Sequence, residues 1–119
     1  MPLLLIKVVL NLNNYTLSEI SFIGGSTQYL TYNVFDVNGT PIDLNGAICQ
    51  MKLRQYGNFG DSAILTKTGN LLQNSFQVVL DSNDTVNLFG KYVQQAIVID
   101  FGGKEFRFQG FVIIDKSIN

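Results

Sequence analysis

The sequence of this chain contains no histidine and no tryptophan, and it has a single cysteine. Histidine is the commonest general base and metal ligand, so its absence excludes Ser–His–Asp and Cys–His arrangements. One cysteine, Cys49, cannot form a disulfide within the chain. Because Cys49 lies in an alternating apolar stretch, we expect a small buried side chain there and not a nucleophile. The sequence therefore predicts that the protein is not an enzyme and has no catalytic residue.

Charge is also scarce, since 14% of the residues are charged and the net charge is −1, whereas soluble domains usually have roughly 25% charged residues. The densest basic stretch is only Lys52 and Arg54. Binding to a phosphate backbone needs clustered Lys and Arg side chains, so we expect no nucleic-acid partner. A weakly charged surface rich in amide side chains is typical of proteins that pack against other proteins. An AT-rich coding sequence would produce the same bias.

Long apolar runs are missing as well. The longest, residues 3–10, is interrupted by Lys7 and falls far short of the ~20 apolar residues that span a bilayer. No basic segment precedes this run and no small-residue cleavage site follows it, so it does not resemble a signal peptide. We interpret it as a β-strand and expect no membrane partner.

The carboxylates form two local pairs, Asp36 with Asp43 and Asp81 with Asp84. Neither pair has the spacing of a cation-binding loop or of a glycosidase cleft. We expect these side chains to stabilise turns and to cap one helical turn over residues 86–89. The sequence thus predicts neither a metal ion nor a cofactor.

What the sequence does contain is alternation. Apolar and polar residues alternate in segments 3–12, 16–23, 27–35, 47–54, 63–67, 76–80 and 92–114, with turn residues between them. Short, evenly spaced strands of this kind predict an all-β fold, namely an antiparallel β-sandwich of about seven to eight strands. With 119 residues and no linker-like segment, the chain is expected to form a single domain, 1–119.

The last of these segments predicts a hairpin. The Gly-Gly pair at 102–103 suits a two-residue turn. Such a turn would set Ile97 opposite Phe108 on the inward face and Val98 opposite Arg107 on the outward face.

The N-terminal segment 3–12 is apolar on both faces. A strand that is buried on one side needs only one apolar face. Leu3, Leu5 and Val9 make the second face of this strand apolar as well. Two explanations are open: a neighbouring subunit covers these residues, or the strand lies in the middle of the sandwich under a loop. The first explanation makes Leu3, Leu5 and Val9 candidate protein-interface residues.

Aromatic side chains supply a second candidate surface. By alternation Tyr29, Phe35 and Phe111 face away from the core and could form an outward patch. Tyr29 and Phe35 are therefore further candidate interface residues. Together with Asn33 they are also the candidates for an alternative function, a carbohydrate-binding or receptor-binding module, since sugars stack on exposed aromatic rings.

Three segments carry a resemblance to a known family. Residues 35–47, FDVNGTPIDLNGA, are similar to a D-x-x-G-x-P-I-D-L-x-G-A stretch of small β domains in bacteriophage virions. Residues 80–92, with Gly90 and Tyr92, resemble a later turn and strand start of those domains, and residues 110–114 resemble their closing strand. The best-known relatives are the N-terminal immunoglobulin-like domains of phage upper baseplate proteins.

This resemblance implies an immunoglobulin-like β-sandwich in a virion structural protein that acts by protein–protein contact. Its partners would be other virion structural proteins of the capsid, tail or baseplate, and the protein would be oligomeric or bound to a lattice. Family members usually continue into a longer protein, whereas this chain has 119 residues. That difference favours a stand-alone virion part: a capsid auxiliary (decoration) protein, or a small head–tail, tail or baseplate component.

Overall fold

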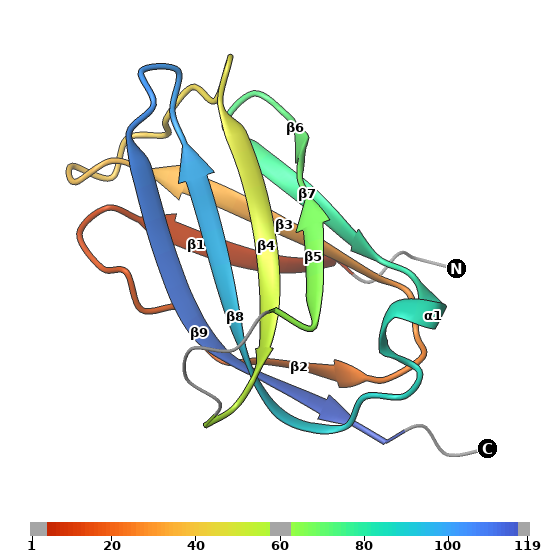
Figure 1. Ribbon diagram of the computed structural model, residues 1–119. Helices are drawn as coiled ribbons and strands as arrows, with labels where there is room; N and C mark the ends of the chain where they lie inside the picture. Colours follow the sequence, from red (N-terminus) through yellow and green to blue (C-terminus); the bar gives the residue numbers. More distant parts are fainter. Residues whose placement is uncertain (1–4, 58–62, 117–119) are drawn as a thin grey trace.

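Two β-sheets pack face to face in this protein (Figure 1). The computed structural model describes residues 5–57 and 63–116, and for Leu5 it describes the backbone alone. One sheet has the strand order β1 (Leu5–Asn11), β3 (Gln28–Phe35), β7 (Ser75–Leu80), β6 (Asn70–Leu71). The other has the order β2 (Ile20–Ile23), β9 (Glu105–Asp115), β8 (Gly90–Ile99), β4 (Ile48–Gln55), β5 (Leu65–Thr68). The predicted β-sandwich is confirmed.

The two sheets are mixed and not purely antiparallel. β1 pairs in parallel with β3, and β2 pairs in parallel with β9, while the other pairs are antiparallel. Alternation of side chains shows which face of a strand is buried, but it carries no information on the direction of the neighbouring strand. The parallel pairs therefore could not be predicted from the pattern.

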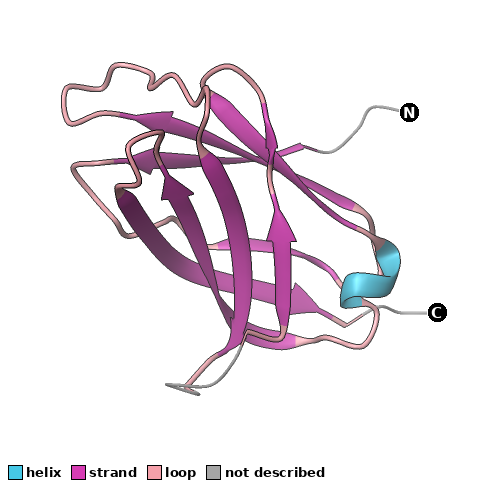
Figure 2. Cartoon of the chain, turned by 45° about the horizontal axis from the view of Figure 1, so that its top comes forward, coloured by secondary structure: helices cyan, strands magenta, loops and turns pink. Residues whose placement is uncertain are grey.

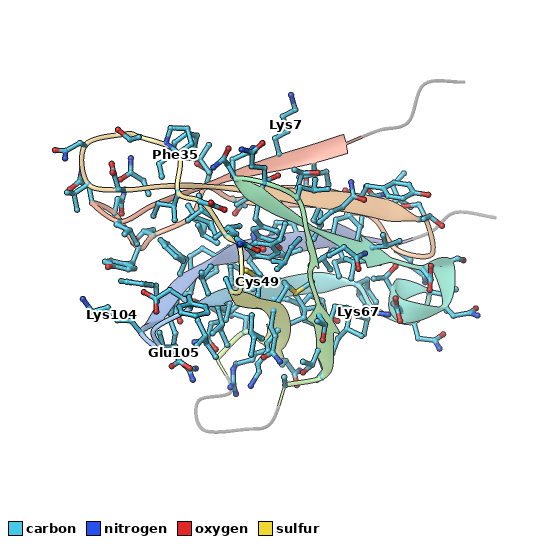
Figure 3. The ribbon with its side chains drawn as sticks, turned by 90° about the horizontal axis from the view of Figure 1, so that it is seen from above. Lys7, Phe35, Cys49, Lys67, Lys104 and Glu105 are labelled. Atoms are coloured by element: carbon cyan, nitrogen blue, oxygen red, sulfur yellow. The ribbon has the colours of Figure 1, made fainter. Side chains whose placement is uncertain are left out.

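The core lies between the sheets and follows the alternation of the central strands. Cys49, Met51 and Leu53 of β4 are each 1% exposed, as the sequence predicts. Figure 3 shows Cys49 between the two layers. Burial raises the pKa of the Cys49 thiol to about 11, so this side chain is a neutral core residue at physiological pH.

The β8–β9 hairpin differs from the prediction by one residue. Asp100 N–H donates to the carbonyl oxygen of Lys104 at 2.9 Å, and Gly103 N–H donates to the carbonyl oxygen of Asp100 at 2.9 Å, so the loop has three residues. Val98 therefore lies opposite Phe106, and Ile97 lies opposite Arg107. The predicted inward face of β8 is wrong, because Val98 is in the core cluster, whereas Ile97 is on the outer face of the sheet, where it is covered and 3% exposed.

The corrected register brings a polar side chain into the core. Gln94 of β8 is 0% exposed, and its Oε1 accepts a hydrogen bond from the Tyr32 hydroxyl at 2.7 Å. Tyr32 belongs to β3, so this bond joins the two sheets. Burial raises the pKa of the Tyr32 phenol, which keeps the hydroxyl protonated as a donor. Within the described residues, Gln94 Nε2 has no hydrogen-bond partner.

The one helical turn among the described residues, α1, comprises Ser82–Thr85 and not residues 86–89 as predicted. It starts directly after Asp81, whose N–H donates to the Asp84 carboxylate at 2.8 Å. Figure 2 shows α1 at the end of the sandwich opposite the β8–β9 loop. No helix within the described part of the chain is long and apolar enough to cross a membrane.

Candidate interaction surface

The N-terminal strand lies at the edge of the four-stranded sheet, with β3 as its sheet neighbour. Val8 and Leu10 point inward and are 4% and 0% exposed, whereas Val9 points outward and is 58% exposed. Figure 3 shows Lys7, another outward residue of β1, pointing away from the sandwich. The explanation that β1 lies under a loop in the middle of the sandwich is therefore wrong, and the outward position of Val9 is confirmed.

The backbone of β1 also has an open edge. Leu12 N–H donates to the carbonyl oxygen of Phe35 at the end of β3, while the carbonyl oxygen of Asn11 accepts from Asn14 on the other side. Because successive residues of a strand direct their backbone groups to opposite edges, the groups of Val8 face β3 and those of Val9 face away from it. Apart from the bridge between Asn11 and Asn14, no described strand pairs with this edge.

A groove of about 240 Å³ runs along the open edge. One wall is β1 from Lys7 to Asn11, and the other is formed by Asn14, Thr16 and Ser18 of the connection to β2 and by Ile20, the first residue of β2. The second wall is mainly polar and uncharged. The groove therefore offers backbone hydrogen-bonding groups next to an exposed valine, which is the arrangement that accepts an added β-strand.

Of the other predicted interface residues, Leu3 lies outside the described residues. Leu5 pairs with Tyr29 in the β1–β3 ladder, and its side chain lies outside the described part. Tyr29 and Phe35 are half-buried on the outer face of β3. They are six residues apart on one strand, which separates them by roughly 20 Å at ~3.3 Å per residue. They belong to the same face as Val9 but do not form one cluster.

Phe111 does not join them, which corrects the predicted outward patch. It lies on β9, in the other sheet. Its ring makes an edge contact with Tyr56, with the centroids 5.6 Å apart, and Lys91 Nζ lies 4.1 Å from its centroid. The three aromatic residues therefore belong to different sheets.

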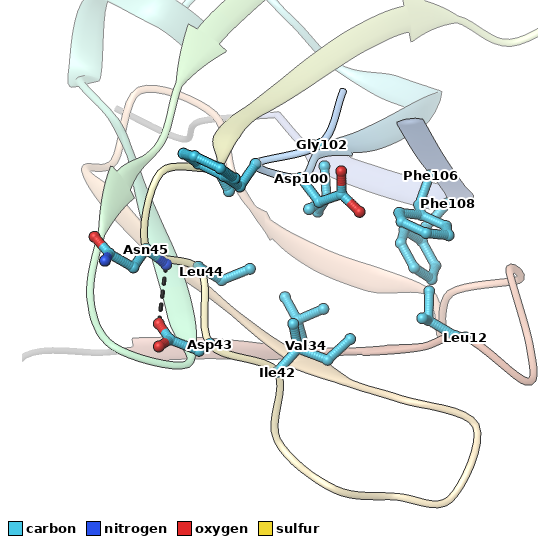
Figure 4. Close-up of a pocket in the computed structure, with 13 residues that line it drawn as sticks. Leu12, Val34, Ile42, Asp43, Leu44, Asn45, Asp100, Gly102, Phe106 and Phe108 are labelled. Carbon is cyan, nitrogen blue, oxygen red and sulfur yellow. Dashed lines mark hydrogen bonds between the residues drawn. The ribbon is translucent and has the colours of Figure 1, made fainter. Parts of the chain in front are cut away.

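A second hollow, which the sequence did not indicate, opens at the end of the sandwich (Figure 4). We call this hollow, about 320 Å³ in volume, the loop-end cavity. Its walls are mainly apolar and include Leu12, Val34, Ile42, Leu44, Phe106 and Phe108. Its lining also includes Asp43, Asn45, Asp100 and Phe101, and Phe101 is 87% exposed. The segments that form it, residues 42–47 and the β8–β9 loop, are far apart in the sequence, so no local pattern could have revealed it.

The carboxylates support turns. Asp36 Oδ1 accepts from the N–H groups of Asn38 and Thr40, and Asp43 Oδ1 accepts from Asn45 N–H, all at 2.9 Å. Asp84 lies 2.9 Å from Lys67 Nζ. Burial alone would raise the pKa of Asp84, but the hydrogen bonds from Lys67 and Asp81 and the charge of Lys67 lower it. Within the described residues no group of His, Cys, Asp or Glu could hold a metal ion.

The fold and these surfaces define a β-sandwich domain with an open sheet edge. Among solved structures, the chain is similar to one described as "N-terminal domain of phage TP901-1 ORF48", with a TM-score of 0.62 and 11% sequence identity. The match covers 93% of this chain and 98% of that one. At this identity the match shows a shared fold. No protein-family model matches the chain, and no curated protein matches it.

Proposed function

We propose that this chain is a structural protein of a bacteriophage virion that acts by protein–protein contact and not as an enzyme. Two independent likenesses support the proposal. Residues 35–47 resemble the domains of phage upper baseplate proteins, and the whole fold is similar to an N-terminal domain of a phage protein. The resemblance favours a place in the tail or baseplate over a capsid auxiliary role.

The observation that carries the proposal is the open edge of β1 beside the exposed Val9. An edge strand with free backbone groups and an apolar outward side chain is prone to pair with another chain. We infer that another virion protein adds a strand along Lys7–Asn11 and covers Val9. Main-chain hydrogen bonds would supply affinity in such a contact, and the groove beside β1 would supply selectivity.

Proline substitutions at two adjacent positions test this contact. Proline removes one N–H and is tolerated on an edge strand when that N–H faces away from the sheet. Val9→Pro is expected to fold, with a small loss in melting temperature, but to be lost from purified particles. Val8→Pro is the matched control; it removes an N–H directed at β3 and is expected to unfold the domain.

The measurements are thermal melts of both variants and quantification of the protein in particles purified from a host that produces only the variant. Incorporation of a folded Val9→Pro protein at the wild-type level would contradict the β1 contact. Absence of the wild-type protein from purified particles would contradict the virion assignment itself.

The carbohydrate-binding alternative has less support. Tyr29 and Phe35 stand roughly 20 Å apart on β3 by the ~3.3 Å rise per residue, so one sugar ring cannot contact both. Asn33 lies between them on the same outer face.

A further inference from the structure

The β8–β9 hairpin carries contrasting surfaces at its two ends. Its loop contributes Asp100 and Phe101 to the lining of the loop-end cavity. At the other end, Phe89 immediately precedes β8 and Lys116 immediately follows β9. β8 has ten residues, so the two ends are roughly 30 Å apart at ~3.3 Å per residue. Figure 1 shows the hairpin running along the length of the five-stranded sheet.

The end near α1 presents an apolar projection next to a cation. Phe89 is 65% exposed and Val86 is 49% exposed, and both line the same shallow hollow. Lys116 Nζ lies 6.0 Å from the centroid of the Phe89 ring. We call Val86, Phe89 and Lys116 the α1-end knob. Exposed aromatic side chains grouped with other apolar residues mark interaction sites more often than isolated ones do.

The loop end has the complementary properties. The cavity has apolar walls, and its volume of about 320 Å³ is at the low end for a ligand pocket and leaves room for an aromatic side chain. The charged residues that line the cavity are the carboxylates Asp43 and Asp100, with no Lys or Arg among the described lining residues, and Asp36 lies on the adjoining turn. A suitable occupant is therefore an apolar side chain next to a positive charge.

We propose that copies of this chain associate end to end, with Phe89 of one copy in the loop-end cavity of the next and Lys116 beside its Asp43 and Asp100. The two surfaces lie at opposite ends of one molecule, so the contact is heterologous and can repeat along a row of copies. The proposal is independent of the strand addition at β1, which uses a different surface.

A two-fold contact through the exposed Phe101 is the rival arrangement for a second copy. It would bring the acidic surroundings of two cavities face to face, and like charges oppose such an approach. The end-to-end contact instead places the cation of one copy next to the carboxylates of another. The Lys116 cation beside the Phe89 ring therefore favours the α1-end knob as the occupant, with the exposed carboxylate of Asp115 next to Lys116 in the chain.

Sedimentation velocity over a concentration series tests the proposal with the full chain. A contact this small is expected to be weak, so the series should extend to about 1 mM, in order to detect dissociation constants in the millimolar range. We expect the average sedimentation coefficient to rise continuously with concentration, without a plateau at the dimer. Phe89→Ser should abolish the rise, whereas Ile64→Ser, which changes a 47% exposed residue just before β5, should leave it unchanged.

A charge swap identifies the two surfaces. Asn45 is an exposed residue of the cavity lining. Asn45→Lys and Lys116→Glu should each weaken association about two- to fivefold, the range of exposed ion pairs, and the double variant should recover the wild-type value. Thermal melts should show that all variants remain folded.

Three results would overturn the proposal. One is sedimentation that does not depend on concentration across the series. Another is a dimer plateau that persists in Phe89→Ser, which would assign the contact to another face. The third is additive weakening of association in the double variant, with no recovery. It would show that Asn45 of one copy does not lie next to Lys116 of another.

Discussion

Two turns of this protein have the same construction, yet only one of them is obvious in the sequence. In residues 36–40 and in residues 100–104, the N–H of the first residue donates to the carbonyl oxygen of the fifth at 2.9 Å. The first residue is aspartate in both, and its Oδ1 accepts from the N–H of the fifth at 2.9 Å and 2.8 Å. The fourth is glycine in both, with φ of 81° at Gly39 and 88° at Gly103.

The comparison shows which residues set a hairpin register. At 36–40 the Asn-Gly pair and Pro41 mark the turn clearly. At 100–104 the Gly-Gly pair suggests a two-residue loop, although Asp100 and Gly103 have the spacing of Asp36 and Gly39. Aspartate at the first position and glycine at the fourth predict a three-residue loop with a bulge. A three-residue loop places Val98, and not Ile97, on the inward face of β8.

The largest expected effect follows from the register that this loop imposes. Val98→Asp places a carboxylate in the apolar core opposite Phe106 and should cost several kcal/mol, enough to unfold the domain. Ile97→Asp places the charge on the outer face opposite Arg107, at a position that is only 3% exposed, so it should also destabilise the domain but less than Val98→Asp, because Arg107 can pair with the carboxylate. Thermal melts give the melting temperatures of both variants. A greater loss of melting temperature in Ile97→Asp would contradict the three-residue loop and support the two-residue loop.

A smaller effect distinguishes the two glycines of the β8–β9 loop. Gly103→Ala should cost about 1–2 kcal/mol because an L-residue is strained at positive φ. Gly102 does not have a positive φ, and a Cβ there would lie 3.5 Å from Asp100 Oδ1, so Gly102→Ala should be nearly neutral. Gly39→Ala is the matched control and should lose as much as Gly103→Ala. Urea unfolding measures all three, and equal losses at Gly102 and Gly103 would show that the two turns differ.

The smallest effect concerns the aspartates. Asp36 Oδ1 accepts from two backbone N–H groups, of Asn38 and Thr40, whereas Asp100 Oδ1 accepts from that of Lys104. Each bond contributes ~0.5–1.5 kcal/mol, with exposed bonds at the low end. Asp36→Ala should therefore destabilise the domain more than Asp100→Ala by about 0.5 kcal/mol or more. Urea unfolding curves of both variants give their free energies of unfolding. A larger loss of stability in Asp100→Ala than in Asp36→Ala would mean that the number of hydrogen bonds does not determine which aspartate contributes more.

The sequence predicted the features that depend on local pattern. The inward face of β4 and the outward position of Val9 follow from alternation along a single strand. The parallel partners of β1 and β2 and the loop-end cavity depend on segments that are distant in the sequence. The predicted two-residue loop implies an outward Gln94, and a polar residue in the core gives no other local sign of its burial. Tyr29 and Phe35 face outward as predicted but do not form a cluster, because six residues along an extended strand separate them.

The pairing of β2 with β9 has a consequence for how the protein is made. Ile20 pairs with Val112, so the two strands of this edge are separated by about 90 residues of chain. A ribosome adds roughly 5–20 residues per second, and β2 therefore waits for seconds before its partner strand exists. During that interval Phe22, which is 8% exposed in the folded protein, has no core to enter. Pairings between strands this distant in the sequence slow folding and prolong the time in which the chain can aggregate. The yield of folded protein at high expression levels should therefore depend on temperature and on chaperones more strongly than the stability of the folded domain alone would suggest.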